Sequence, residues 1–384
     1  MVTEHGRHRR RRKRHVVALV VAAALLLAGA GISFALLLGS GRTGDRASAG
    51  QTSASRSTGS ATSQPTPSSA ASASQAAGPA ASLATPTLGA SVPVGGTPQY
   101  VQVAPDGSFA YVTDPAAGTV LRVDTGTDAV TATIPVPQGP PQWLSFSADG
   151  RRAFVSVYDA NYRANYVVYV DTTTDAVTNA VAVDPGPYAV SPSPDGRTLY
   201  VPLYLQARID VVDIASASVV GRIQAPANPH WLAYSKDGRF GYVTDHFSNV
   251  VSVLDVSRNS VVGTIPVGAG PHSIEAAPDG SRIVVVNYIG DTASVIDPAT
   301  NTVVATVPDV GAEPQDVTYA PDGRHLYTAN SEDGTVSVVD TSSNTVAARV
   351  PTGASPTSVA VTPDGRKAYV TNFDDGTLRV LRTG

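Results

Sequence analysis

The sequence predicts an all-β fold, a seven-bladed β-propeller with four-stranded blades, behind an N-terminal region of different composition. The first observation is a repeated Asp-Gly pair whose spacings are 43, 46, 42, 42, 43 and 42 residues. The second is that each repeat reads as four short strands, and the third is that the two ends of the repeat region complement each other. A period near 42 residues made of strands and turns is typical of propellers. The pairs are Asp106-Gly107, Asp149-Gly150, Asp195-Gly196, Asp237-Gly238, Asp279-Gly280, Asp322-Gly323 and Asp364-Gly365.

One complete unit spans residues 308–351. Its apolar runs are short, rich in Val, Thr, Tyr and Ile, and often alternate with polar residues, as half-buried strands do. Pro321-Asp322-Gly323 closes the first hairpin, because proline presets φ and glycine supplies a positive φ. No cluster of apolar residues at helical spacing competes with this interpretation within residues 87–384. The four predicted strands are residues 314–319, 325–329, 335–340 and 345–350.

The ends of the repeat region predict how the ring closes. The last unit stops at residues 378–382 and lacks its fourth strand, while a spare strand at residues 88–94 precedes the first unit. We expect the N-terminal strand to complete the last blade, which would remove the open sheet edges that promote aggregation. The alternative is a disordered lead-in followed by a truncated blade.

Short motifs in these repeats resemble the YVTN family of propeller repeats, and the resemblance covers residues 88–384. It implies the propeller fold but no particular activity, because relatives among surface-layer proteins, lactonases and streptogramin lyases do unrelated things on one scaffold. Two blades depart from the pattern at Phe154-Val155-Ser156-Val157 and Tyr200-Val201-Pro202-Leu203, which lack the polar fourth residue. Val284-Val285-Val286-Asn287 keeps that residue but lacks the tyrosine. The motifs that carry the resemblance are Tyr111-Val112-Thr113-Asp114, Tyr242-Val243-Thr244-Asp245, Tyr369-Val370-Thr371-Asn372 and the outer turns Asp297-Pro298-Ala299-Thr300-Asn301 and Asp340-Thr341-Ser342-Ser343-Asn344.

The N-terminal region predicts export. A basic segment at residues 1–15 precedes 23 residues without a charge, 16–38, which are long enough to span a bilayer as a helix. Positive charge favours the cytoplasmic side, so the propeller at residues 87–384 should lie outside the cytoplasm on a single-pass anchor. The alternative is a signal peptide cleaved near Ala28-Gly29-Ala30, which would release a secreted protein. Either way, the membrane is an expected partner through residues 16–38.

Residues 39–86 predict a disordered linker. They are mostly Ser, Ala, Thr, Gly and Pro, and such a composition cannot bury enough apolar surface to fold. We expect this linker to act as a tether that lets the propeller move within the layer just outside the membrane.

Charge and cysteine content exclude some functions. Residues 1–86 hold ten of the 27 basic and two of the 31 acidic residues, which leaves the propeller with 17 and 29 and a net charge of −12. That sign disfavours nucleic acid as a partner. The chain has no cysteine, so disulfides, thiol chemistry and a covalent c-type heme site are excluded.

A polar ring around one end of the central channel is the predicted ligand-binding site. Loops that enter the innermost strands and turns that join second and third strands share one face of a propeller, where function usually collects. Hydrogen-bonding groups around one pore suit a small polar ligand, or they only satisfy loop backbone groups and channel water. The first set is Gln99, Gln142, Tyr188, His230, His272, Gln315 and Thr357, and the second is Asp114, Asp245, Asn287, Asn330 and Asn372.

Two histidines in this ring, His230 and His272, occupy equivalent places in adjacent blades, with Glu275 or His246 expected nearby. Imidazole is a good ligand for zinc or copper and a good general base near neutral pH. The pair also resembles the histidine pair of streptogramin lyases, although the catalytic acids of that family have no matching positions here. The remaining alternative is a repeat-derived structural pair. We therefore expect no cofactor apart from a divalent metal at His230 and His272.

A nine-residue insertion loop in the second repeat is the second predicted contact surface. It spans residues 158–166, explains the 46-residue spacing, and contains Tyr158, Tyr162, Arg163 and Tyr166. Tyrosine and arginine are suited to binding sugars, peptides or a protein partner. The alternative is a loop that packs on itself and caps the channel.

Enzyme motifs are mostly absent: there is no Gly-x-Ser-x-Gly, His-Glu-x-x-His, phosphate-binding glycine loop or Asp-x-Asp-x-Asp-Gly loop. The sequence therefore favours a membrane-anchored extracytoplasmic module that binds a ligand, a cell-envelope protein or a glycan. The alternatives are a channel-mouth hydrolase or lyase, lactonase-like or streptogramin-lyase-like, that uses His230, His272 and Glu275, and a purely structural envelope protein.

Overall fold

The computed structural model describes residues 78–384. The basic segment 1–15, the apolar segment 16–38 and most of the linker 39–86 lie outside the described residues, so the anchor and the export of the propeller stay predictions. Within residues 78–384, no helix has the length and hydropathy needed to cross a bilayer.

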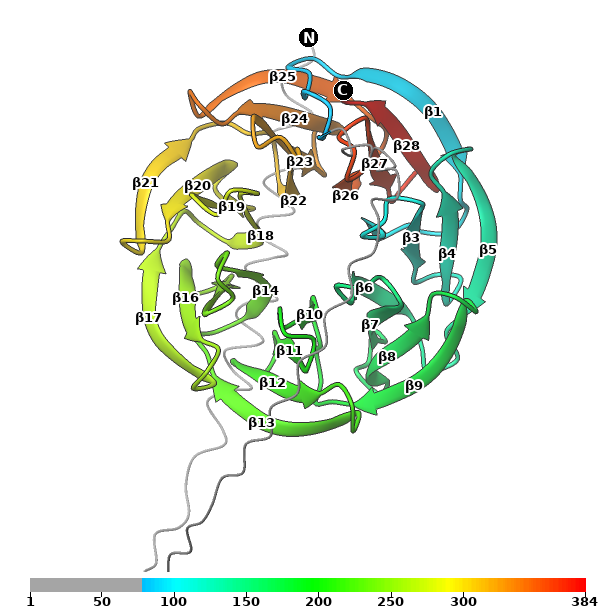
Figure 1. Ribbon diagram of the computed structural model, residues 1–384, viewed down its shortest axis with the longest axis vertical. Helices are drawn as coiled ribbons and strands as arrows, with labels where there is room; N and C mark the ends of the chain where they lie inside the picture. Colours follow the sequence, from blue (N-terminus) through cyan, green and yellow to red (C-terminus); the bar gives the residue numbers. More distant parts are fainter. Residues whose placement is uncertain (1–77) are drawn as a thin grey trace, which may run out of the picture. The chain divides into compact units, whose positions relative to one another are not determined.

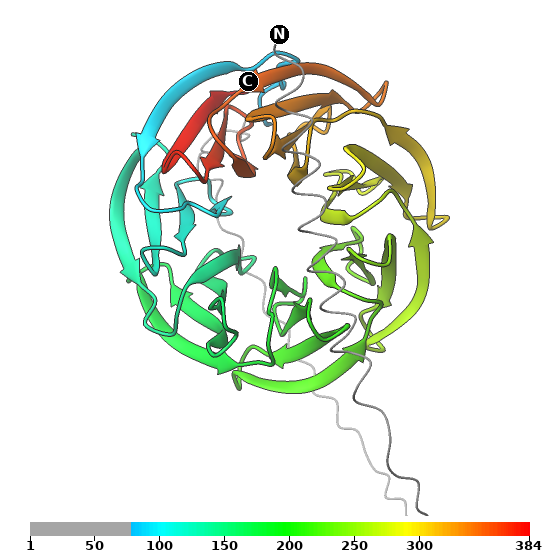
Figure 2. The ribbon, with the colours of Figure 1, turned by 180° about the vertical axis from the view of Figure 1, so that it is seen from behind.

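The described part of the chain confirms the predicted all-β propeller: seven four-stranded antiparallel sheets surround one axis as blades 1 to 7 (Figure 1). Figure 2 shows the same closed ring from behind. Blade 1 consists of β2 (Tyr100–Val103), β3 (Phe109–Asp114), β4 (Thr119–Asp124) and β5 (Ala129–Pro135). Blade 2 consists of β6 (Pro141–Phe146), β7 (Arg152–Tyr158), β8 (Asn165–Asp171) and β9 (Ala176–Ala182). Blade 3 consists of β10 (Ser191–Pro192), β11 (Thr198–Leu203), β12 (Arg208–Asp213) and β13 (Ser218–Gln224).

The remaining blades repeat this order, with the first strand of each nearest the axis. Blade 4 consists of β14 (Pro229–Tyr234), β15 (Phe240–Asp245), β16 (Val250–Asp255) and β17 (Ser260–Pro266). Blade 5 consists of β18 (Pro271–Ala276), β19 (Ile283–Asn287), β20 (Thr292–Asp297) and β21 (Thr302–Val307). Blade 6 consists of β22 (Pro314–Tyr319), β23 (His325–Asn330), β24 (Thr335–Asp340) and β25 (Thr345–Pro351). Blade 7 consists of β26 (Pro356–Val361), β27 (Lys367–Asn372), β28 (Thr377–Arg382) and β1 (Thr87–Pro93).

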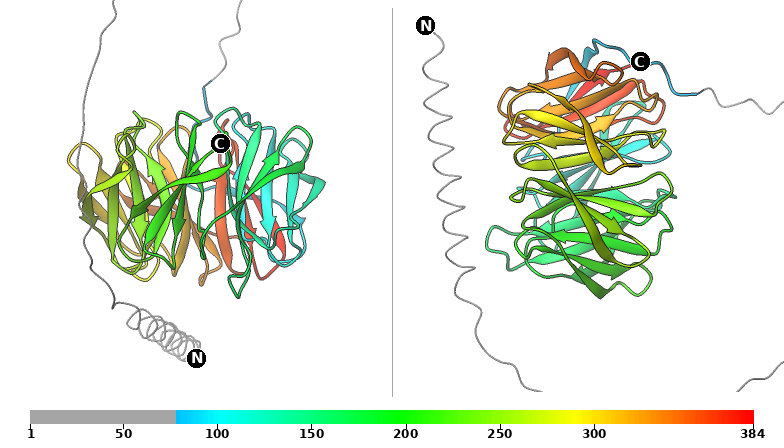
Figure 3. Two further views of the ribbon diagram at one scale, coloured as in Figure 1. Left: turned by 90° about the horizontal axis from the view of Figure 1, so that it is seen from below. Right: turned by 90° about the vertical axis from the view of Figure 1, so that its left-hand side faces the viewer.

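Burial is greatest in the middle strands of each blade. The second and third strands of each blade carry the core; every residue of β3 is buried, for example, whereas in β25 on the rim exposed residues alternate with half-buried or buried ones. Stacked blades bury both faces of their central strands, which explains why these strands read as nearly continuous Val, Ile, Leu and Tyr. Turns and interblade loops consequently lie on the two faces of the propeller (Figure 3).

The first strand of the propeller closes the ring, as the sequence predicts. β1 lies antiparallel beside β28, and its Val92 is opposite Leu378 in the register. Residues just before β1 are also fixed, although the linker prediction included them: Ser82 is buried, and its hydroxyl contacts Asp322 (2.8 Å) and Nδ1 of His325 (2.7 Å). The ordered region therefore starts earlier than residue 87.

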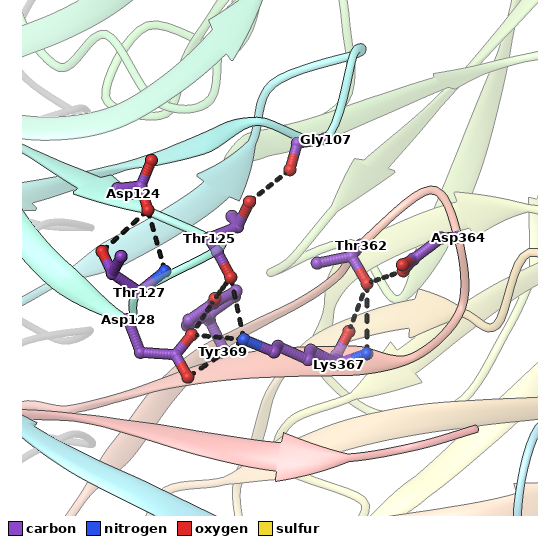
Figure 4. A network of polar contacts seen from close by, with 9 residues as sticks. All are labelled: Gly107, Asp124, Thr125, Thr127, Asp128, Thr362, Asp364, Lys367 and Tyr369. Atoms are coloured by element: carbon purple, nitrogen blue, oxygen red, sulfur yellow. Dashed lines mark hydrogen bonds and ion pairs between the residues drawn. The ribbon is translucent and has the colours of Figure 1, made fainter.

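Tyrosines of the second strands join neighbouring blades. The Tyr369 hydroxyl donates a hydrogen bond of 2.5 Å to Asp128, in the outer turn of blade 1, and Lys367 bonds to the same carboxylate at 2.9 Å (Figure 4). Tyr242 similarly donates to Asn301 at 2.9 Å. The acceptors sit at positive φ, 55° for Asp128 and 53° for Asn301, where Asp and Asn are tolerated best among residues with a side chain. The motif tyrosine and the outer-turn Asn or Asp thus form one interblade contact.

Candidate ligand-binding channel

Three histidines from blades 4 and 5 lie together at one mouth of the channel. The ring centroid of His230 is 4.8 Å from that of His246 and 5.0 Å from that of His272, and the His246 and His272 centroids are 5.7 Å apart. We call these three residues the histidine cluster. The structure therefore brings together the predicted pair and the neighbour that the sequence offered as an alternative to Glu275.

The backbone near the histidines is fixed by the second strands. The hydroxyl of Thr244 in β15 donates to the carbonyl of His272 at 2.6 Å and accepts from the N–H of Trp231 at 3.0 Å. A register shift between Pro229 and Leu232 accommodates this bond. An irregular pairing register in the innermost strand, and not a regular alternation of its side chains between the two faces, places these residues at the mouth.

Both ring nitrogens of His272 take part in hydrogen bonds. Its Nδ1 lies 2.6 Å from the carbonyl oxygen of Gln315, so that nitrogen carries the proton, and its Nε2 accepts from the Tyr188 hydroxyl at 2.9 Å. Burial, with a smaller contribution from His246, lowers the pKa of His272 to about 3. In this arrangement, neither ring nitrogen is free to take a proton from a substrate, so the geometry does not favour the predicted general base.

His230 and His246 are neutral too, but their ring nitrogens form fewer hydrogen bonds. The His230 ring stacks on Tyr188 with centroids 4.0 Å apart; its Nδ1 is buried without a partner, and burial holds its pKa well below the usual value. His246 Nδ1 donates to the Pro271 carbonyl at 3.3 Å, and burial lowers its pKa to about 4. No hydrogen bond joins His246 Nε2 to another described residue, and this atom is not among the fully buried polar atoms that lack a partner. The Nε2 atom of His230 likewise has no hydrogen bond to a described residue, but only in His246 does a bond from Nδ1 to a backbone carbonyl fix Nε2 as the acceptor, so His246 Nε2 is the better placed of the two to meet a ligand.

Aromatic rings surround the histidine cluster on the side of blades 2 to 5. Tyr188 lies 3.7 Å from Trp143 and 4.9 Å from Trp231 between ring centroids. This packing makes the mouth apolar on one side of the axis only. The rings that complete this aromatic wall are Tyr158, Tyr162, Tyr204 and Tyr288.

The insertion loop is part of this wall. Tyr162 stacks on Tyr158 at 5.8 Å and its hydroxyl contacts that of Tyr204, while Asp159 accepts the N–H of Arg163 at 2.6 Å. Tyr166 packs against the core between blades 1 and 2. The loop therefore packs on itself at the mouth, with the Arg163 side chain exposed to solvent.

Three exposed apolar side chains at this face were not predicted from the sequence. Leu205, Phe247 and Ile289 are 46 %, 51 % and 49 % exposed, and each occupies the second position of the turn between the second and third strands of its blade. Each follows a ring that faces the mouth, namely Tyr204, His246 and Tyr288. Aligning the repeats by these turns would have shown the shared position. We call Leu205, Phe247 and Ile289 the apolar arc.

The other members of the first predicted set pair with backbone groups at the mouth or act through their own backbone. Gln142 Nε2 donates to the Tyr158 carbonyl at 3.1 Å, and Thr357 donates to the Gln99 carbonyl at 2.7 Å. Gln315 contributes the carbonyl that orients His272.

The second predicted set is buried within the hairpins. Asn287 Nδ2 donates to Ser294 at 3.0 Å and Asn330 Nδ2 to Ser337 at 2.9 Å, so each side chain spans its own turn. Asp114 instead accepts the N–H groups of nearby loop residues. These side chains are positioned to hold the turns and have no exposed surface with which to meet a ligand; Asp114 is 2 % exposed, and Asp245, Asn287, Asn330 and Asn372 are 0 % exposed.

Replacing Asp245 with asparagine should stabilise the propeller at alkaline pH. Asp245 occupies the position of Asn287 and Asn330, and burial raises its pKa to about 7. A raised carboxyl pKa means that the folded state binds more protons, so the wild type loses stability as pH rises from about 4 through 7. The Asp245→Asn variant has no such loss, and its advantage should grow by about 2 kcal/mol between pH 5 and pH 8 in urea unfolding. An advantage that is equal at both pH values would contradict this assignment.

Glu275 lies deeper in the channel than the histidine cluster. It lines a cavity of about 340 Å³ to which all seven blades contribute, together with Asp316. The residues 78–384 contain no group of three or more His, Cys, Asp or Glu side chains arranged to hold a metal ion.

Comparison with known proteins shows the fold and little beyond it. The profile of the family described as Cytochrome D1 heme domain matches residues 295–383, less than half of the chain. Among solved structures, hydrazine synthase of Kuenenia stuttgartiensis is similar, with a TM-score of 0.67 and 23 % identity over 76 % of this chain and 96 % of that one. No curated protein matches the sequence. The propeller fold is thus shown, whereas the YVTN type of its repeats is not.

The family match corrects the cofactor prediction. We expected no cofactor apart from a divalent metal, and a match to a family described by its heme points to heme instead. The matched segment contains one histidine, His325, whose Nδ1 contacts Ser82 away from the mouth. The histidine cluster lies outside the matched residues, so any heme ligand in this chain has to be assigned from its own geometry.

Proposed function

We propose that this protein is a ligand-binding propeller whose channel mouth holds a flat, largely apolar ligand, and that heme is the ligand class. The observation that carries the proposal is His246, whose Nδ1 is held by the Pro271 carbonyl at 3.3 Å while its Nε2 has no partner among the described residues. We also propose, from the sequence of residues 1–38, that the chain is anchored in the membrane and that the propeller lies outside the cytoplasm.

A free imidazole nitrogen with its ring held by a carbonyl, as in His246, suits heme better than it suits a bare ion. A zinc site needs three or four protein ligands, and the described residues offer no such group. Heme iron already has four pyrrole nitrogens and needs one or two axial ligands, often a histidine. A ligating histidine usually donates its other ring N–H to a carbonyl or carboxylate, which His246 does.

The surroundings of His246 fit an apolar plate. Phe247 and Ile289 of the apolar arc are half exposed, and the Tyr288 ring lies 6.0 Å from the His246 ring. Exposed apolar side chains gathered beside an aromatic wall are typical of ligand sites. When bound there, heme would supply an iron centre for electron transfer or for binding a small molecule.

Heme titration of the full chain tests this proposal. Adding ferric heme should give a saturable shift of its Soret absorbance at one heme per chain, because one imidazole ligates the iron. His246→Ala should weaken binding by about tenfold or more, since removing the axial ligand removes most of the specific attachment.

The matched control is His325→Ala, which removes the histidine inside the family match and leaves the mouth intact. Binding that survives His246→Ala but fails in a folded His325→Ala variant would move the site to blade 6. A chain that shows no saturable binding of heme would overturn the proposal.

A further inference from the structure

The cavity in the middle of the channel is a second feature, separate from the mouth. Its lining residues follow the mouth residues by one to four positions along each innermost strand, as Trp231 follows His230 and Ser273 follows His272. Its volume of about 340 Å³ falls in the range of small-molecule sites. It is therefore large enough to hold a small ligand beneath the histidine cluster.

Two carboxyl groups line this cavity, and among the described residues no Lys, Arg or His side chain lines it with them. Asp316 is 4 % exposed and accepts hydrogen bonds from the hydroxyls of Ser273 (2.7 Å) and Ser358 (2.8 Å). Glu275 has no hydrogen bond to any described residue, and the charged group that shifts its pKa is another carboxylate, Asp316. The pair consequently lacks a positive partner among residues 78–384.

The protonation equilibria agree with a missing cation. Burial, and then the charge of Asp316, raise the pKa of Glu275 to about 8, and burial raises the pKa of Asp316. Tyr100 also lies close enough for both carboxylates to raise its pKa, after the effect of burial. Carboxyls that share a site without a counter-ion resist ionisation in this way.

Other polar atoms of the cavity also lack partners. Gln102 Oε1 and Ser145 Oγ are buried without a hydrogen bond, and both residues line the cavity. An amide oxygen and an ionised carboxylate can only accept hydrogen bonds, and a hydroxyl can accept or donate. A ligand that pairs with these atoms or with an ionised Glu275 therefore has to bring N–H or O–H donors.

Aromatic rings complete the lining. Tyr100 and Trp231, with ring centroids 6.4 Å apart, both contribute to it. The face of an indole or phenol ring attracts a cation placed within about 6 Å. Carboxylates, unpaired acceptors and aromatic rings that line one cavity all favour the same kind of ligand, a cation with hydrogen-bond donors.

We propose that this cavity binds a small primary amine as its ammonium ion. The ammonium group supplies the missing positive charge and three N–H donors, and its alkyl portion fits against the aromatic and aliphatic walls. A neutral alcohol brings a donor but no charge, and a quaternary ammonium brings charge but no donor. A bare divalent ion would find only two carboxylates, short of the six to eight oxygens that calcium takes.

Calorimetric titration of the full chain with propylamine, 1-propanol and tetramethylammonium tests this assignment. Propylamine should bind saturably, and the other two should bind at least about tenfold more weakly, because each lacks one of the two features that the cavity recognises. Glu275→Gln keeps the shape of the side chain and should weaken propylamine binding by about tenfold or more.

The matched control is Asp374→Asn, which makes the same charge change in an exposed loop and should leave the affinity unchanged. A second variant, Gln102→Leu, removes an acceptor without changing charge and should weaken binding by a smaller factor. No heat with propylamine, or equal binding of propylamine and 1-propanol, would overturn the assignment and leave the cavity to water. Heme binding at the mouth does not enter this experiment, so the two proposals fail separately.

Discussion

A chain that begins at residue 94 should unfold at a temperature about 10 °C or more below that of a chain that begins at residue 78. The shorter chain lacks β1, and blade 7 then has three strands. Five β1 residues, from Thr87 to Pro93, pair with β28 in the intact ring, and Val92 is buried against it. Losing these hydrogen bonds and this apolar contact should cost about 5 kcal/mol.

The effect has two parts, because β28 would also become an open edge. Its buried residues Leu378 and Val380 would face solvent, and unpaired N–H and C=O groups along the strand would invite other chains. The shorter chain should therefore associate at micromolar concentration, which light scattering would detect. The longer chain, which keeps β1 and the Ser82 contacts, is the control.

A synthetic peptide covering residues 78–93 sharpens the test. Added to the shorter chain, it should restore the melting temperature and the monomer by strand addition, and a peptide of the same composition in scrambled order should not. Equal melting temperatures and equal monomer fractions for the two chains would show that β1 does not hold the ring.

The second large effect is expected at Asp316: replacing it with alanine should destabilise the propeller by about 3 kcal/mol. Asp316 in β22 joins three blades through Ser273 of β18 and Ser358 of β26, and it also accepts the N–H of Val359 at 3.1 Å. Alanine would leave these donors buried without an acceptor, and each unsatisfied group costs about 1 kcal/mol or more.

Urea unfolding of single variants separates this contribution from a general effect of mutating the channel. Ser273→Ala and Ser358→Ala each remove one donor and leave the carboxylate with its remaining partners, so each should cost about 1 kcal/mol. An Asp316→Ala variant no less stable than the two serine variants would mean that the carboxylate does not tie the blades together.

The fold was predictable because its signals are local. The Asp-Gly turns need a glycine at positive φ, as at Gly107 with φ of 76° and Gly238 with φ of 70°. Because the turn recurs every 42 to 46 residues, its seven copies give the number of blades. The spare strand before blade 1 predicted that β1 closes the ring. Even the pairing of Tyr369 with Asp128 has a local trace, since both residues recur at fixed places in the repeat.

The site was predictable only in part. The sequence placed His230 and His272 at the channel mouth, but it placed Asn287, Asn330 and Asn372 there as well, and these lie buried in their hairpins. A shift of one residue turns a strand side chain to the opposite face of the sheet. The register shifts near Pro229 and Pro271 cannot be predicted from the alternation of polar and apolar residues in the sequence. Glu275 was expected beside the histidines and instead lines the cavity below them.

By itself, the sequence determined the number of blades, the strands, the turns and the closure, because each follows from the conformational preferences of a few adjacent residues. Only the tertiary structure decided which side chains meet. The Tyr188 hydroxyl reaches His272 across 84 residues of sequence, and Asp316 reaches Ser358 across 42. Contacts at that separation depend on how neighbouring blades are rotated and spaced around the axis. That packing sets the protonation of the histidine cluster, the free nitrogen of His246 and the raised pKa of Glu275.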